Sequence, residues 1–125
     1  MKQKYVRPIK KFLWKVLFEI SRLDWIAEPG CPARSFVHDH NRTERTTVRR
    51  GKITEKRYNP KIGTWTERTY SEGESFWVPA GTIHEVRCDE GHAITFNVVF
   101  GRLFMNRWES IEEFSEEKQK AVSSV

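Results

Sequence analysis

The sequence predicts an all-β protein, a sandwich or barrel folded as a single domain over residues 1–125. Short segments rich in β-branched and aromatic residues follow one another between residues 23 and 100, and clusters of glycine, proline, asparagine and aspartate separate them. The chain has 125 residues, which is long enough for one hydrophobic core and too short for a second. Regular short strands with turn signals between them are typical of a closed or two-sheet β architecture.

The first element is expected to be an amphipathic helix over residues 8–23. Large apolar side chains recur there at spacings of three and four, as on one face of a helix. Pro8 suits the first turn of such a helix. The alternation of Trp14, Val16 and Phe18 leaves a second interpretation open, in which the later half of this segment is an edge strand.

The strands that follow are expected at residues 23–27, 35–40, 46–50, 52–58, 64–70, 75–79, 84–88 and 94–100. Alternation places His84, Val86 and Cys88 on one face of their strand. In the last strand the sequence leaves open which of its two faces, one of them carrying Asn97, points inward. The charged tail from residue 110 to 121 is expected to form a short C-terminal helix.

Composition argues against several classes of protein. Hydrophobic residues make up 38% and charged residues 31%, which excludes a disordered chain, and no apolar run approaches the length of a membrane span. The net charge is +5, but basic residues are spread along the chain among acidic ones, so no nucleic-acid role is expected. Cys31 and Cys88 are expected to be free thiols, and without a visible secretory signal the expected location is the cytoplasm.

Three of the four histidines are placed as if to share a metal ion. His38 and His40 lie two apart in a strand-like stretch, so their side chains point the same way, and His84 follows a turn. Imidazole is the commonest side-chain ligand for transition metals. Together with the Glu44 carboxylate, this donor set suits Fe(II), Mn, Ni, Co or Zn better than Mg or Ca.

Two spaced blocks around these histidines closely resemble the paired motifs of the cupin family. They are His38-x-His40-x3-Glu44-x6-Gly51 and Gly73-x5-Pro79-x-Gly81-x2-His84. The resemblance implies a cupin double-stranded β-helix, or jelly-roll barrel, with its core at about residues 20–108. It also implies a divalent metal inside that barrel, held by His38, His40, Glu44 and His84.

Within the cupins, the segments His38-Asp39-His40, 51–55 and 82–86 look like those of the cysteine dioxygenase type, the thiol dioxygenases. That resemblance implies Fe(II) held by three histidines, with a thiol and dioxygen at its open positions. The chain departs from the family at Glu44, which takes the place of a cysteine or glycine. It also departs at residues 95–99, which lack the family's histidine and tyrosine, and no arginine matches the family's clamp for a substrate carboxylate.

Three functional interpretations therefore stand open. The first is a mononuclear iron dioxygenase of the thiol type, and the second is a cupin with three histidines and one glutamate that acts on an oxygen-rich substrate. The third is a cupin that binds a metal or small molecule without catalysis. Spacing favours Glu44 as a ligand, whereas pairing with Arg42 or Arg68 would turn it outward. No catalytic residue is assigned.

The expected partners are a small-molecule substrate and, for the dioxygenase, molecular oxygen. Three side chains are candidates for the substrate pocket: Cys88, Asn97 and Arg34. Aromatic residues are candidates for an apolar lining: Trp25, Phe36, Trp77 and Phe96. The apolar strip around Phe12, Trp14 and Phe18 offers a surface through which two copies could form a homodimer.

Overall fold

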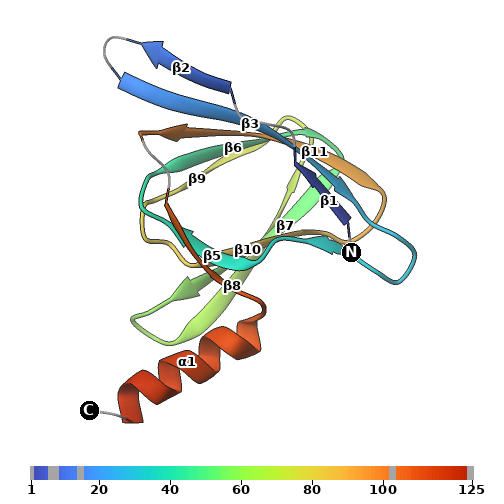
Figure 1. Cartoon of the computed structure of the whole chain (residues 1–125). Coiled ribbons are helices and arrows are strands. Elements are labelled where there is room, and N and C mark those ends of the chain that lie inside the picture. The colour runs from blue at the N-terminus through green and yellow to red at the C-terminus, as the bar shows by residue number, and fades with distance from the viewer. Residues whose placement is uncertain (1, 6–8, 14–15, 102–103, 124–125) are drawn as a thin grey trace.

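The computed structural model describes residues 2–5, 9–13, 16–101 and 104–123, with side chains described for residues 18–101 and 104–120 (Figure 1). The chain is mostly β, with a single helix in the described part at its C-terminal end. The strands are β1 (Lys2–Tyr5), β2 (Ile9–Leu13), β3 (Val16–Ile26), β4 (Ala33–Arg34), β5 (Val37–His40), β6 (Glu44–Arg50), β7 (Lys52–Asn59), β8 (Thr64–Ser71), β9 (Ser75–Val78), β10 (His84–Cys88), β11 (His92–Phe100) and β12 (Met105–Trp108). The helix is α1 (Ile111–Ser123).

These strands form two antiparallel sheets that face each other around the interior, an arrangement consistent with a cupin jelly roll (Figure 1). One sheet has the order β1-β3-β11-β6-β9, with β2 paired to β3. The other has the order β12-β5-β10-β7-β8, with β4 paired to β10. The strands expected between residues 35 and 100 are present, and their ends differ from expectation by at most two residues.

The helix predicted over residues 8–23 is wrong in the described part of that segment, which forms β2 and β3. β3 pairs with β11 over nine residues, from Phe18 opposite Phe100 to Ile26 opposite His92. This ladder satisfies the backbone of the segment and packs it on the barrel, and such tertiary pairing overrides a helical spacing of apolar residues. The alternative interpretation, in which the later half of the segment is an edge strand, agrees better with the structure. It differs in one respect, because β3 lies between β1 and β11 and is therefore an inner strand of its sheet.

The hydrophobic core fills one part of the barrel and leaves another part open. Its buried cluster includes Val48, Ile53, Phe76, Val78 and Ala93, drawn from both sheets. In β11 the buried positions alternate, so that Ala93, Thr95, Asn97 and Val99 point inward. The structure thus decides which face of β11 points inward, a question that the sequence left open. Asn97 lies on this inward face.

Helix α1 packs on the outside of the barrel through one aromatic side chain. Phe114 is 2% exposed and makes edge-on ring contacts with Tyr58, Trp65 and Trp108 at centroid distances of 5.0, 5.7 and 5.1 Å. The helix begins after Ser110, whose Oγ accepts a hydrogen bond from the Glu113 backbone N–H, as an N-cap residue does. In the described residues, no helix has the length and apolar character needed to cross a membrane.

Candidate metal centre

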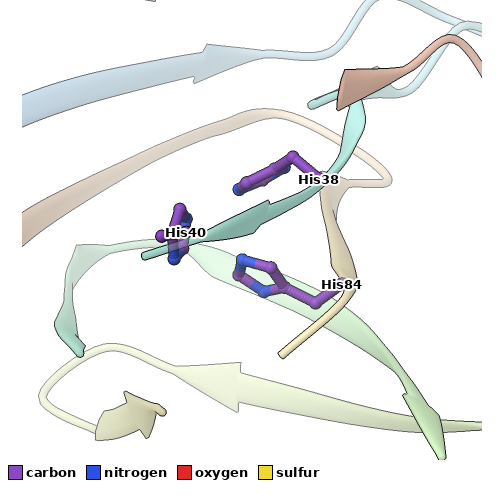
Figure 2. A group of neighbouring side chains, drawn as sticks. All are labelled: His38, His40 and His84. Atoms are coloured by element: carbon purple, nitrogen blue, oxygen red, sulfur yellow. The ribbon is translucent and has the colours of Figure 1, made fainter. Parts of the chain in front are cut away.

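Three histidines meet inside the barrel, as the spacing of the sequence predicts. His38 and His40 extend from β5, and His84 is the first residue of β10, directly opposite His38 in the ladder between these strands. Figure 2 shows the three rings turned toward one another. Their centroids are 4.5 to 5.1 Å apart, and one ring nitrogen from each lies within 4.8 Å of the others. This cluster could bind a metal ion.

Hydrogen bonds hold two of the rings so that one nitrogen of each is left for a ligand. His38 Nδ1 donates to the Phe36 carbonyl at 2.7 Å, and His84 Nδ1 donates to Glu55 Oε2 at 2.8 Å. A carbonyl or carboxylate can only accept, so Nδ1 carries the proton in each ring and Nε2 keeps a lone pair. The buried Nε2 of His84 has no hydrogen-bond partner among the described residues.

His40 is held less tightly. Its Nδ1 is buried and has no described hydrogen-bond partner, and its Nε2 lies 4.0 Å from Glu44 Oε1, which is beyond hydrogen-bond distance. Buried polar atoms are normally paired, and those that are not call for an explanation such as a missing ion. The unpaired nitrogens of His40 and His84, in a cluster with His38, fit a divalent metal that accepts nitrogen ligands.

Burial keeps the rings of His38 and His40 in the neutral form that binds metals. It lowers the pKa of His38 to about 4, with the neighbouring His84 acting in the same direction. It lowers the pKa of His40 to about 3, with His38 and His84 again contributing. Since an imidazole must be neutral to coordinate, His38 and His40 are ready to accept a metal at neutral pH.

Glu55 and Arg57 stand behind His84. The Glu55 side chain is 2% exposed, and besides the proton of His84 it accepts a hydrogen bond from Arg57 Nε at 2.7 Å. Arg57 in turn donates to the Trp77 carbonyl. A carboxylate that holds the outer nitrogen of a metal ligand fixes the tautomer and orientation of the ring and makes it a stronger donor.

In the sequence, Glu55 is the last residue of the segment 51–55 that looks like the cysteine dioxygenase type, and the pattern predicts no role for it. Strand alternation gives a signal, because Ile53, Glu55 and Arg57 share one face of β7. The pairing of Glu55 with Val86 and of Arg57 with His84 depends on the register between β7 and β10, which only the folded chain provides.

Glu44 faces the same interior, at the edge of the histidine cluster. It starts β6 and lines the cavity described below. Its Oε1 lies 3.3 Å from Thr46 Oγ1, whose single hydroxyl proton it shares with the closer acceptor Asn97 Oδ1. Burial raises the pKa of its carboxyl group, against which the nearby His84 and the Thr46 hydrogen bond act. No ion pair joins Glu44 to Arg42 or Arg68 among the described contacts. Glu44 as a metal ligand stays a prediction.

The histidines line an open cavity of about 470 Å³, which is within the usual range for small-molecule sites. Trp25 and Val86 belong both to its lining and to the core cluster, so the core forms part of its wall. Further polar side chains on the wall opposite the histidines bond to one another. Thr46 Oγ1 donates to Asn97 Oδ1 at 2.8 Å, and Trp25 Nε1 donates to Thr95 Oγ1 at 3.0 Å.

The other residues predicted for the pocket lie in several places. Asn97, Trp25 and Phe36 line the cavity. Cys88 is fully buried in the core cluster, where its thiol donates to the Glu90 carbonyl, and it is not part of the lining. Arg34 lies at a separate polar depression of about 270 Å³ beside the start of α1.

Two aromatic residues and the fourth histidine lie outside the cavity lining. Trp77 is 48% exposed, and Phe96 has the opposite parity to Asn97 on β11. His92 is an exposed residue at the start of β11, and its Nε2 pairs with Asp24 Oδ1 at 2.9 Å.

Solved structures with the same fold carry different activities. The chain is similar to peruvianin-I, a cysteine peptidase from Thevetia peruviana latex, with a TM-score of 0.64, 14% identity and coverage of 75% of this chain and 57% of the other. It is similar to oxalate oxidase bound to the substrate analogue glycolate, with a TM-score of 0.63, 18% identity and coverage of 72% and 45%. It is also similar to hydroxypropylphosphonic acid epoxidase from S. wedmorenis in complex with fosfomycin, with a TM-score of 0.53, 20% identity and coverage of 66% and 43%.

The chain therefore spans about half the length of these proteins, and at such low identities the likeness concerns the fold alone. No protein-family model and no curated protein sequence matches the chain. The similarity does not point to the cysteine dioxygenase type in particular. The chain has a cupin fold with a three-histidine cluster that could bind a metal.

Proposed function

We propose that this cupin is a mononuclear non-haem iron dioxygenase that acts on a small molecule. One observation carries the proposal: buried ring nitrogens of His40 and His84, without hydrogen-bond partners in the described structure, converge with His38 on the wall of an open cavity of about 470 Å³. A bound iron would supply neighbouring open positions for a substrate and dioxygen. Mn, Ni, Co and Zn fit the same donors and are the alternatives to iron.

The chain's own residues orient the ligands and line the cavity. The Phe36 carbonyl and the Glu55 carboxylate fix the proton of His38 and His84 on Nδ1, which leaves Nε2 of each ring for the metal. Trp25 and Val86 supply apolar wall, and Thr95 and Asn97 supply polar groups that a substrate can bind. Holding the reactants in place contributes much of the catalysis in such a site.

Glu44 separates two versions of this function. As a fourth ligand beside His40, it favours an oxygen-rich substrate, as in cupins with three histidines and one glutamate. As a non-ligand, it leaves the three-histidine set of the thiol dioxygenase type, to which the neighbouring sequence is similar. The Glu44→Gln variant keeps the shape and removes the negative charge. A large loss of metal affinity supports ligation, and an unchanged affinity rules it out.

The alternative is a cupin that binds a metal or small molecule without catalysis. Residues 95–99 favour it, because Asn97 and Val99 occupy the inward positions on the strand where the thiol dioxygenases carry a histidine and a tyrosine. Oxygen consumption by iron-loaded protein, measured with thiols, diketones and phenols, distinguishes the two. Turnover with any of these substrates supports the dioxygenase. Tight metal binding without oxygen consumption supports the binding protein.

A further inference from the structure

Two arginines flank the histidines in a single row across one sheet. In the ladders of β12, β5, β10 and β7, Arg107 is opposite His38, His38 is opposite His84, and His84 is opposite Arg57. Residues directly opposite each other in a sheet project from the same face. The row Arg107-His38-His84-Arg57 therefore lies on the inner face, with one arginine on either side of the candidate metal ligands.

The two arginines differ in what they bind. Arg57 is engaged, because its Nε donates to the buried Glu55 carboxylate and another of its nitrogens donates to the Trp77 carbonyl. Arg107 lines the cavity, and within the described part of the chain its guanidinium has no carboxylate partner. It lies over the Phe36 ring, 5.7 Å from the centroid, which keeps it at the cavity without neutralising its charge.

The edge strand that carries Arg107 is fixed to the metal-ligand strand. Asp39, which lies between His38 and His40, accepts hydrogen bonds on Oδ1 from the backbone N–H of Asn106 at 3.1 Å and from its Nδ2 at 2.9 Å. Asn106 precedes Arg107, so this contact sets the position of the arginine beside His38. A guanidinium held in one place binds a planar anion with less entropic cost than a mobile one.

Charge makes Arg107 the place where an anion would enter. It is the only arginine or lysine among the described residues that line the cavity, whereas Glu19 and Glu44 place carboxyl groups elsewhere on the lining. A guanidinium presents paired N–H donors that match a carboxylate, and such charge-assisted hydrogen bonds are among the strongest in proteins. An anion bound there would lie next to His38 and thus beside the histidine cluster.

We propose that Arg107 is a specificity-determining residue that binds the carboxylate of a small organic acid, the substrate class of this site. The proposal rests on the proposed function, because it takes the histidine cluster as the reacting centre. Direct opposition of Arg107 and His38 places their Cβ atoms about 4.5–5.5 Å apart, so the acid that spans guanidinium and histidine cluster is short.

The test compares an acid with its amide of the same size. Binding of propionate and propionamide is measured by NMR titration, on metal-free and on zinc-loaded protein, for the wild type, Arg107→Gln and Arg45→Gln. Arg45 is the matched control, because it also lies over an aromatic ring, that of Trp77 at 5.1 Å, but does not line the cavity. Circular dichroism checks folding, and Arg107→Lys provides a second variant that keeps the charge.

We expect the wild type and Arg45→Gln to bind propionate about tenfold or more tightly than propionamide, as a charge-assisted hydrogen bond would give. Arg107→Gln should lose this preference, and Arg107→Lys should keep part of it. Equal binding of acid and amide by the wild type, or an unchanged preference in Arg107→Gln, would overturn the proposal. Failure of the wild type to bind zinc would instead overturn the metal centre, while the metal-free titration still tests Arg107.

Discussion

The carboxylate behind His84 offers the sharpest test of how the metal centre is built. Replacing Glu55 with Gln keeps the shape of the side chain and an oxygen that can accept the hydrogen bond from His84. It removes the negative charge of a side chain that is only 2% exposed. Two hydrogen bonds are affected, from His84 Nδ1 at 2.8 Å and from Arg57 Nε at 2.7 Å. Loss of a carboxylate that supports a metal-binding histidine typically weakens metal affinity by about 10–100-fold.

The same change should also weaken the metal-free protein. Removing one partner of a buried ion pair costs about 3–5 kcal/mol, because the other charge is left without compensation. The Arg57 side chain is 30% exposed, so water can hydrate its charge once the carboxylate is gone. We therefore expect the lower end of that range, about 3 kcal/mol. Urea denaturation of the metal-free form measures this loss, and calorimetric titration with zinc measures the affinity separately.

Glu85→Gln is the matched control for this experiment. Glu85 is 6% exposed and adjoins His84 in the chain, but it lines the outer polar depression beside α1 rather than the metal site. It should leave zinc affinity within about twofold of the wild type, since none of the described hydrogen bonds or ion pairs joins its side chain to the candidate metal ligands. Two results would refute this role of Glu55 in metal binding. Glu55→Gln would bind zinc as tightly as the wild type, or Glu85→Gln would weaken zinc binding as much as Glu55→Gln does.

Four further predictions concern the histidines and the helix. His40→Ala should abolish stoichiometric metal binding measured by elemental analysis. His92→Ala should keep it, because His92 lies outside the cluster and loses only its pair with Asp24. Equal losses would show that the ligands are wrongly assigned. Protons should compete with the metal for His38 and His40 only below about pH 5, because these rings have pKa values of about 4 and 3, and protonation of either ring near pH 6.5 in an NMR titration of the metal-free protein would contradict this. In the metal-free protein the unfolded chain binds protons below pH 6.5 that the folded chain does not, so the free energy of unfolding should fall with decreasing pH by at most about 1.4 kcal/mol per unit for each of these histidines. Phe114→Ala should destabilise the protein to thermal unfolding by about 3 kcal/mol, through loss of its three aromatic contacts, yet leave metal affinity unchanged, and a loss of that affinity would show that α1 supports the centre.

Local signals in the sequence were sufficient for much of the fold. Alternation and turn residues placed the strands between residues 35 and 100 to within two residues at each end, because a half-buried strand repeats every two residues and a turn needs particular backbone angles. Gly51 shows the second effect: its φ is +75°, and a Cβ there would lie 2.6 Å from the His92 carbonyl oxygen. The spacing of His38 and His40 likewise determined that both side chains share a face.

Contacts between distant strands decided what the sequence left open or predicted wrongly. The segment that forms β3 has an apolar spacing that also suits a helix, and its ladders with β1, β2 and β11 make it a strand. The register between β7 and β10 brings Glu55 and Arg57 to His84, and that between β12 and β5 brings Arg107 to His38. A slip of one residue in either ladder would turn those side chains to the opposite face. The sequence by itself therefore determined which residues could bind a metal, and the tertiary structure decided which charged groups surround them, because register is set by pairing across the whole barrel.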